Sequence, residues 1–105
     1  MERRGVLRRP IVPGECRHNG HLYYLLLPNR EKRDAAIEAL KHLRVGAPFH
    51  YVPLHSSPAG RKFSRAEGDL PVTVDVSGRL LRLPIWSDIG NETDAVIAAV
   101  FRILS

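Results

Sequence analysis

Residues 49–60 read Phe-His-Tyr-Val-Pro-Leu-His-Ser-Ser-Pro-Ala-Gly, and the rest of the chain is organised around them. The aromatic, β-prone start is stopped by Pro53, and polar residues then lead into a second proline and a glycine. This order is typical of a strand that opens into a loop, and loops at strand ends often carry sites. Two imidazoles, a phenol and two hydroxyls occur within eight residues. We therefore predict a ligand site formed by His50, Tyr51, His55, Ser56 and Ser57.

The segments before this stretch predict two strands with a helix between them. The unbroken apolar and aromatic run at 21–27 predicts a central strand that is buried on both faces. Residues 30–43 predict a helix, because their apolar residues recur at helical spacing, with Asn29 as N-cap and Gly46 as stop. Residues 47–52 then predict a second strand, which Pro48 restricts to an edge of the sheet because proline lacks an amide donor.

The segments after it predict a long loop, a short strand and a closing helix. Residues 53–71 are rich in Ser, Gly, Arg and Lys, and this length favours a binding loop or an interface over a passive connection. Residues 72–76 alternate like a strand, although Thr73 could cap a short helix through residue 81. A short strand is expected at 81–86 and a helix at 92–104. The sum is an α+β fold, an α/β two-layer sandwich with a small, mostly antiparallel sheet and helices on one face.

Length and composition indicate one domain. The 105 residues, 44% hydrophobic and 26% charged, lie in the range of ordinary globular proteins. We expect a basic, loosely held lead-in at residues 1–9 and a single domain at 10–105. No apolar run approaches the roughly 18 residues of a membrane span, and no secretory segment follows Met1, so we expect a cytoplasmic protein without a membrane partner. The single cysteine, Cys16, excludes an internal disulfide.

The sequence gives less support to three other classes of function, namely nucleic-acid binding, metal binding and catalysis through a cysteine. The net charge of +5 is carried mostly by the first nine residues, which favours a solvated tail over a basic arm that binds nucleic acid. The predicted strand at 21–27 also lacks the motif on which RNA-recognition modules stack bases. We therefore do not expect a nucleic-acid partner. Cys-x-His-x-x-His at 16–21 lacks a second ligand pair, and His50 and His55 have opposite strand parity, so we expect no metal site. Cys16 also lacks an evident oxyanion site, so we expect no catalytic residue.

The motifs in their order resemble a known family. Residues 50–60, followed by Leu-Pro-Val-Thr at 70–73 and Ser-Gly-Arg-Leu-Leu-Arg-Leu-Pro at 77–84, resemble the carboxy-terminal small domain of the DegT/DnrJ/EryC1/StrS sugar aminotransferases. The nearest likeness is to the transaminases that make a 4-amino-4,6-dideoxy sugar on a thymidine diphosphate carrier. Pro-Gly-x-Cys-x-x-Asn-x-His-x-x-Tyr at 13–24 resembles the segment that leads into that domain.

The resemblance implies a part of a fold type I enzyme that depends on pyridoxal phosphate. In this family an amino group passes from glutamate to the cofactor and then to the keto carbon of a nucleotide sugar. The small domain closes over the sugar nucleotide, and the enzyme is usually a homodimer. By the same resemblance, the segment from His50 to Gly60 lines the mouth of the active site, with His50, Tyr51, His55, Ser56 and Ser57 near the substrate.

The chain departs from the family at the cofactor site. None of Lys32, Lys41 and Lys62 has the serine-preceded context of the family's Schiff-base lysine, and the phosphate-binding turn is also missing. We therefore expect the chain alone to bind no pyridoxal phosphate and to be inactive, and we expect self-association through the surface that a large domain would cover. The alternative is a non-catalytic module that binds a nucleotide sugar or a nucleic acid.

Overall fold

The centre of the molecule is a two-stranded antiparallel sheet. The computed structural model describes residues 1–105. Strand β1 (Tyr23–Leu26) pairs with β2 (Leu80–Leu83) in a register that places Leu25 opposite Leu81. Single bridges extend the sheet on both sides, from Arg8 to Leu26 and from Phe49 to Leu81. The expected strands at 21–27 and 81–86 are therefore present, in shorter form.

The predicted strand at 47–52 is wrong. Only Phe49 forms a bridge, and the carbonyl of Pro48 accepts a hydrogen bond of 2.9 Å from the amide of Arg82. Pro48 lies within this segment and Pro53 follows it, and neither can donate to a ladder, so pairing ends after one residue. The segment lies beside β2 without becoming a third strand.

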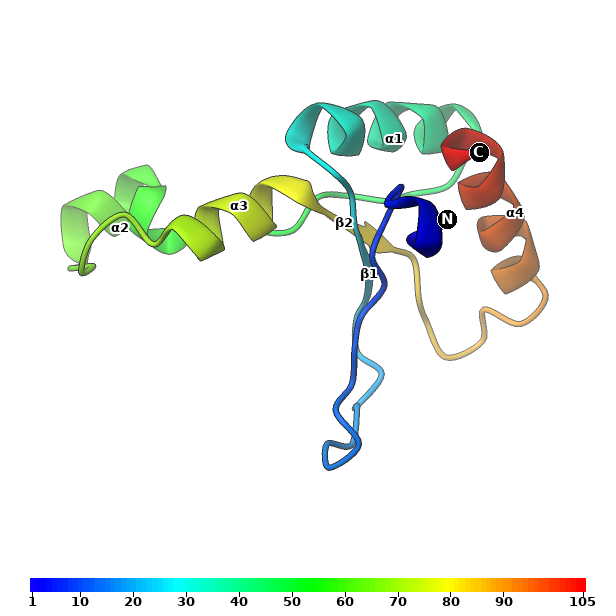
Figure 1. Ribbon diagram of the computed structural model, residues 1–105, viewed down its shortest axis with the longest axis horizontal. Coiled ribbons are helices and arrows are strands. Elements are labelled where there is room, and N and C mark those ends of the chain that lie inside the picture. The colour runs from blue at the N-terminus through cyan, green and yellow to red at the C-terminus, as the bar shows by residue number, and fades with distance from the viewer.

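Two long helices cover one face of the sheet, as expected. Helix α1 (Arg30–His42) begins where the side chain of Asn29 accepts a hydrogen bond of 2.8 Å from the amide of Lys32, which satisfies one of the free amides of the first turn. Helix α4 (Glu92–Leu104) closes the chain. Figure 1 shows α1 above the strands and α4 beside them, with the two chain ends near each other.

The core lies between this sheet face and the two helices. It combines residues of β1, β2, α1, α4 and three connecting segments, namely Leu7, Leu25, Leu27, Ala36, Leu40, Ala47, Leu81, Ala99 and Val100. Leu40 and Leu81 are fully buried. Leu25 and Leu27 have the same strand parity, so both point from β1 towards the helices. This confirms a sandwich with its helices on one face of the sheet.

The segment expected as a loop contains short helices. Residues Leu54–Ser56 form the 3₁₀ turn η2, and Pro58–Phe63 form α2. Helix α3 (Pro71–Arg79) then leads directly into β2, so the helical alternative for this part of the chain is the one observed. Neither α2 nor α3 buries a residue. Figure 1 shows both projecting away from the sheet.

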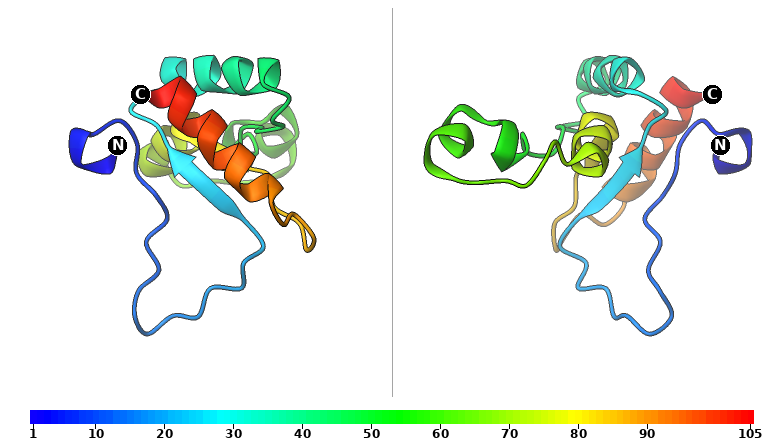
Figure 2. Two further views of the ribbon diagram at one scale, coloured as in Figure 1. Left: turned by 90° about the vertical axis from the view of Figure 1, so that its right-hand side faces the viewer. Right: turned by 60° about the vertical axis from the view of Figure 1, so that its left-hand side comes forward.

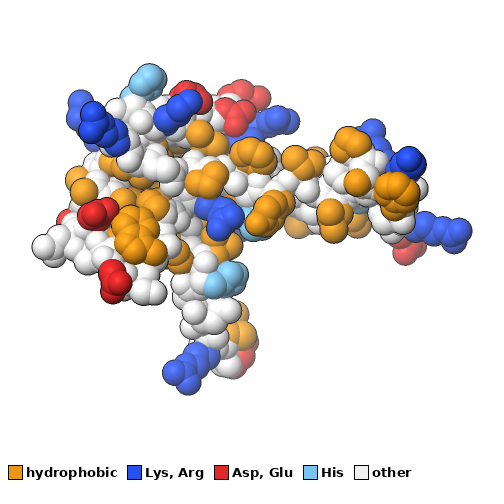
Figure 3. All heavy atoms as spheres, turned by 180° about the vertical axis from the view of Figure 1, so that it is seen from behind, with side chains coloured by type: hydrophobic (Ala, Val, Ile, Leu, Met, Phe, Trp, Pro, Cys, Tyr) orange, Lys and Arg blue, Asp and Glu red, His pale blue; other side chains and the backbone are white.

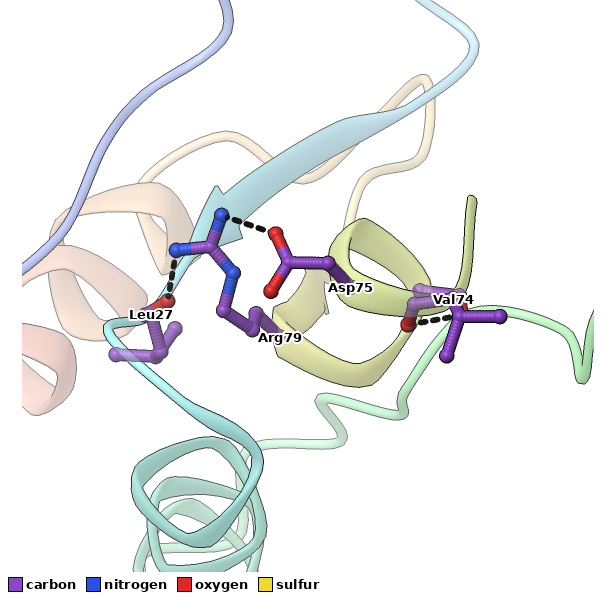
Figure 4. Close-up of polar contacts among 5 residues, drawn as sticks. Leu27, Val74, Asp75 and Arg79 are labelled. Carbon is purple, nitrogen blue, oxygen red and sulfur yellow. Dashed lines mark hydrogen bonds and ion pairs between the residues drawn. The ribbon is translucent and has the colours of Figure 1, made fainter. Parts of the chain in front are cut away.

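Arg79 fastens α3 to the sheet. One guanidinium nitrogen donates to Asp75 Oδ2 at 2.8 Å, and another donates to the carbonyl of Leu27 at 3.4 Å (Figure 4). The backbone of Arg79 also accepts a hydrogen bond from the amide of Leu27 at 3.0 Å. The end of α3 is thereby tied to the end of β1, whereas its beginning has no such contact.

Parts of the first nine residues contact the rest of the fold. Leu7 belongs to the core, and Arg8 bridges to β1. Arg9 donates through its backbone amide and its side chain to Glu2, each at 2.8 Å. This pairing holds the pKa of the exposed Glu2 carboxyl below its ordinary value of 4.5. Residues 7–9 thus pack against the fold, although the division into a lead-in and one domain stays a prediction.

The molecule is extended. Its radius of gyration is 15.5 Å, whereas a compact domain of this length has roughly 13 Å. Figure 2 shows the reasons, because the loop before β1 hangs below the sheet and the segment with α2 projects sideways. No helix has both the length and the apolar character needed to cross a membrane.

Candidate functional site

The five predicted site residues form two separate groups. His50 and Tyr51 follow the bridge at Phe49, and their rings meet edge to face with centroids 4.9 Å apart. Tyr51 is 74% exposed, while His50 is half-buried and its Nδ1 atom is buried without a hydrogen-bond partner. A buried ring nitrogen without a partner is available to a ligand or a water molecule.

His55 and Ser56 line an open hollow between η2, α2 and α3. Its volume is about 510 Å³, and it is lined by His55, Ser56, Gly60, Arg61, Ser64, Ala66, Gly68, Asp69 and Val74. The Ser56 hydroxyl donates to the carbonyl of Pro53 at 3.0 Å, which leaves its lone pairs free to accept. The imidazole, hydroxyl and guanidinium groups among the lining residues can donate hydrogen bonds to an anionic ligand, while Asp69 adds one carboxylate to the lining.

Ser57 caps α2. Its hydroxyl donates to the carbonyl of Leu54 at 2.9 Å and accepts from the amide of Gly60 at 3.0 Å. Pro58 follows at the first helical position, where its missing amide has no consequence. Ser57 does not line the hollow. Its role near a substrate stays a prediction, and its observed role is to start the helix that carries Arg61.

Gly60 sets the distance between η2 and α2. A Cβ atom at this position would lie 1.5 Å from the carbonyl oxygen of Leu54, so only glycine permits this approach. Arg61 follows Gly60 in α2 and lines the same hollow as His55 and Ser56. The proline-serine-glycine sequence of residues 53–60 therefore determines the shape of the hollow.

Arg61 was missed by the sequence analysis. In a stretch rich in Ser, Gly, Arg and Lys, one cation looks like any other solvated charge. The available signal was the order Ser57-Pro58, which starts a helix and places residue 61 one turn later. Asp69 and Ser64 also line the hollow and were not predicted.

A cation–π contact involves Phe49, the residue that precedes His50. Arg33 of α1 is 5% exposed, and its guanidinium carbon lies 5.3 Å from the centroid of the Phe49 ring. Its Nε atom lies 2.6 Å from the carboxylate of the exposed Asp34. The contact fixes Phe49 against α1 and so positions the start of the segment that carries His50 and Tyr51.

Three kinds of likeness to known proteins agree with this architecture. The family model described as "DegT/DnrJ/EryC1/StrS aminotransferase family" matches residues 2–101. An uncharacterised protein of Methanocaldococcus jannaschii is 36% identical over 101 residues, which cover 91% of this chain and 26% of that protein. A dTDP-3-amino-3,4,6-trideoxy-alpha-D-glucose transaminase of Micromonospora megalomicea is 27% identical over 93 residues, covering 83% of this chain and 24% of the relative.

Two solved structures share the fold. The aminotransferase TlmJ of Streptoalloteichus hindustanus superposes with a TM-score of 0.77 at 28% identity, covering 94% of this chain and 26% of the other. A DegT/DnrJ/EryC1/StrS aminotransferase of Brucella abortus gives a TM-score of 0.79 at 25% identity, covering 97% of this chain and 27% of the other. The chain spans about a quarter of the length of the relatives it matches. The family match over almost the whole chain confirms the resemblance, and the chain belongs to the DegT/DnrJ/EryC1/StrS aminotransferase family.

Proposed function

We propose that this chain serves as the small-domain part of a nucleotide-sugar aminotransferase dependent on pyridoxal phosphate. The observation that carries the proposal is the family match over residues 2–101, together with coverage of only about a quarter of each relative. The reaction is amino transfer from glutamate to a dTDP-4-keto-6-deoxy sugar. The cofactor, when bound in such an enzyme, takes up electrons from the reacting carbon.

The lysines of this chain do not fit the cofactor. The Lys41 ammonium lies 4.0 Å from a carboxylate oxygen of Glu38, and the Lys62 ammonium lies 5.0 Å from the centroid of the Phe63 ring. Lys32 is exposed at the start of α1. None lies in the hollow. We therefore assign no reaction step to this chain, and its part is to bind and orient the sugar nucleotide.

The hollow supports a binding role. Arg61 and the hydroxyl of Ser56 are suited to the diphosphate of a nucleotide sugar, because a charged and a neutral donor line the same hollow. His55 adds a ring nitrogen that can donate or accept according to its tautomer. His50 and Tyr51 lie in the segment that precedes η2, and we expect them to contact the same substrate.

Nuclear magnetic resonance tests this binding role directly. The chain is titrated with a thymidine diphosphate sugar, and we expect weak binding with shifts concentrated at His55, Ser56 and Arg61. The variants His55→Ala and Arg61→Ala should abolish these shifts. His42→Ala removes an exposed histidine from the far end of α1 and should leave them intact. Shifts that are absent, or that survive both hollow variants, contradict the proposed binding site.

A transaminase assay tests the expectation that the chain alone is inactive and does not bind pyridoxal phosphate. With pyridoxal phosphate, glutamate and a dTDP-4-keto-6-deoxy sugar, the chain alone should give no amino sugar. It should also develop no visible absorbance from a lysine-bound cofactor. If the chain alone produced the amino sugar, the assignment of the cofactor site to a separate large domain would be wrong.

The alternative is a non-catalytic nucleotide-sugar module, and the same hollow favours it, because binding there requires no lysine. Both functions predict binding by the chain alone, so the two are distinguished by adding a large domain that carries the Schiff-base lysine: the proposed function predicts amino transfer in that mixture, and the alternative predicts none. A nucleic-acid module would differ from both functions by salt-dependent retention on RNA or DNA.

A further inference from the structure

The hollow between η2, α2 and α3 contains a positive and a negative side chain that do not pair with each other. Arg61 and Asp69 both line it, and neither takes part in an ion pair of the chain. Their charged atoms therefore lie more than 4.0 Å apart. Figure 3 shows basic and acidic side chains near the end of the projection that carries α2. The hollow thus offers a cation and a carboxylate to the same ligand.

The backbone around Asp69 is strained. Asp69 lies between Gly68 and Leu70, whose φ angles are 66° and 45°, and Pro71 then begins α3. Leucine rarely adopts this left-handed conformation, because its Cβ atom approaches the neighbouring carbonyl oxygen. Strained residues of this kind are concentrated at ligand sites. This strain distinguishes Asp69 from the other lining residues and indicates a role in binding.

A diphosphate alone would use only part of the hollow. Its oxygens accept hydrogen bonds and carry negative charge, so they suit Arg61 and are repelled by the Asp69 carboxylate. The Asp69 oxygens need a ligand group that donates, and a cationic donor forms a stronger bond than a neutral one. The volume of about 510 Å³ lies in the range of sites that hold a whole small molecule. A ligand that satisfies both side chains therefore carries an anion and, elsewhere, a cationic donor.

The proposed reaction gives the nucleotide sugar this second group. The keto oxygen of the substrate can only accept hydrogen bonds, whereas the amino group of the product is a cation at neutral pH and donates. Beside a carboxylate the keto oxygen is repelled and the ammonium group is attracted. Both forms carry the same diphosphate, so Arg61 cannot distinguish them. Asp69 carries the only negative charge in the lining and can do so.

From the unpaired charges and the strained turn, we infer that Asp69 makes the hollow selective for the amino form of the nucleotide sugar over its keto form. Arg61 holds the diphosphate, and the Asp69 carboxylate accepts a hydrogen bond from the ammonium group that transamination creates. Asp69 is thus a specificity-determining residue, and the hollow binds the product of the reaction more tightly than the substrate. The inference rests on the proposed function, because both ligands belong to it.

Parallel titrations followed by nuclear magnetic resonance test this selectivity. The two ligands are a dTDP-4-amino-4,6-dideoxy sugar and the corresponding dTDP-4-keto-6-deoxy sugar. The amino form should bind about threefold to fivefold more tightly, as expected from one exposed ion pair. Asp69→Asn keeps the size of the side chain and removes its charge, so it should make the two affinities equal. The matched control Glu67→Gln removes the same charge from an exposed residue outside the hollow, and it should keep the preference.

A further variant separates the two charged residues. Arg61→Gln should weaken both ligands alike and leave the ratio of their affinities unchanged, because Arg61 contacts only the diphosphate. Equal affinities for the wild-type chain, with shifts at Arg61, overturn the inference and leave the proposed binding site intact. A preference that Asp69→Asn retains, or that Glu67→Gln also abolishes, overturns the inference as well. If neither ligand binds, the inference and the proposed function are both wrong.

Discussion

At the scale of single residues, Gly60 is the position with the least tolerance for change. A Cβ atom there would meet the carbonyl of Leu54 at 1.5 Å, so Gly60→Ala should force η2 and α2 apart. We expect amides of residues 54–63 to exchange at least about tenfold faster. The same variant should also bind a thymidine diphosphate sugar in the hollow more weakly.

Gly78→Ala is the matched control for this change. Gly78 lies inside α3, and no atom lies within 4 Å of the position of its missing Cβ. Because alanine restricts the unfolded chain without strain here, the variant should be more stable by about 0.5–1 kcal/mol in denaturant unfolding. Normal exchange in Gly60→Ala would show that the approach to Leu54 is not needed.

Glu2 and Arg9 provide a test of the amino-terminal contacts. The hydrogen bonds from Arg9 lower the pKa of the Glu2 carboxyl below 4.5. A group whose pKa is lower in the folded state contributes stability at neutral pH and loses it as the pH falls through its folded pKa. In the Arg9→Gln variant the pKa of Glu2, followed by nuclear magnetic resonance, should rise, because the charged side-chain donor is lost while the backbone amide of residue 9 still donates. An unchanged pKa would mean that residues 1–9 are not held as described.

At the scale of elements, the N-cap of α1 should contribute measurable stability. Asn29 accepts from the amide of Lys32 at 2.8 Å, and loss of such a cap costs about 1 kcal/mol. Asn29→Ala should lower the free energy of unfolding by that amount. Asn91 occupies the same position before α4 without a side-chain cap bond, so Asn91→Ala should have little effect. Equal effects of the two variants would contradict the capping geometry.

The two long helices and the two strands could be predicted from sequence, whereas η2 and α2 could not, and α3 was expected only as the alternative to a strand. Ala36, Ile37 and Leu40 recur at helical spacing because α1 buries one face, and α4 follows the same rule. Alternating valines at 72–76 indicated a strand, yet Arg79 ties this segment to β1 as a helix. Local spacing contains no information about such a distant contact.

The candidate site was predicted only in part, because the positions of some of its residues depend on short helices that the local sequence did not predict. His55 and Ser56 were identified from residue type alone, and the structure places both in the hollow. Arg61 was missed because its position depends on α2, a six-residue helix that Ser57 and Pro58 begin. The separation of the His50 and Tyr51 pair from this hollow depends on the turn at η2, which residue types do not indicate.

At the scale of the whole molecule, stability rests on a small core. Only twelve of 105 residues are buried, so each large core side chain matters. Leu40→Ala or Leu81→Ala should lower the free energy of unfolding by about 2–5 kcal/mol. The exposed Ile11→Ala should change it by less than about 0.5 kcal/mol. Thermal and urea unfolding followed by circular dichroism measure both, and similar losses for all three variants would contradict the assigned core.

The central claim is that this chain acts as one part of a larger aminotransferase. The most direct test is to read the coding DNA upstream of the Met1 codon in the source genome, in the frame of this chain. The account predicts an uninterrupted frame that encodes a large domain with a serine-preceded lysine for the cofactor. An in-frame stop codon, with no neighbouring gene for such a domain, would contradict it.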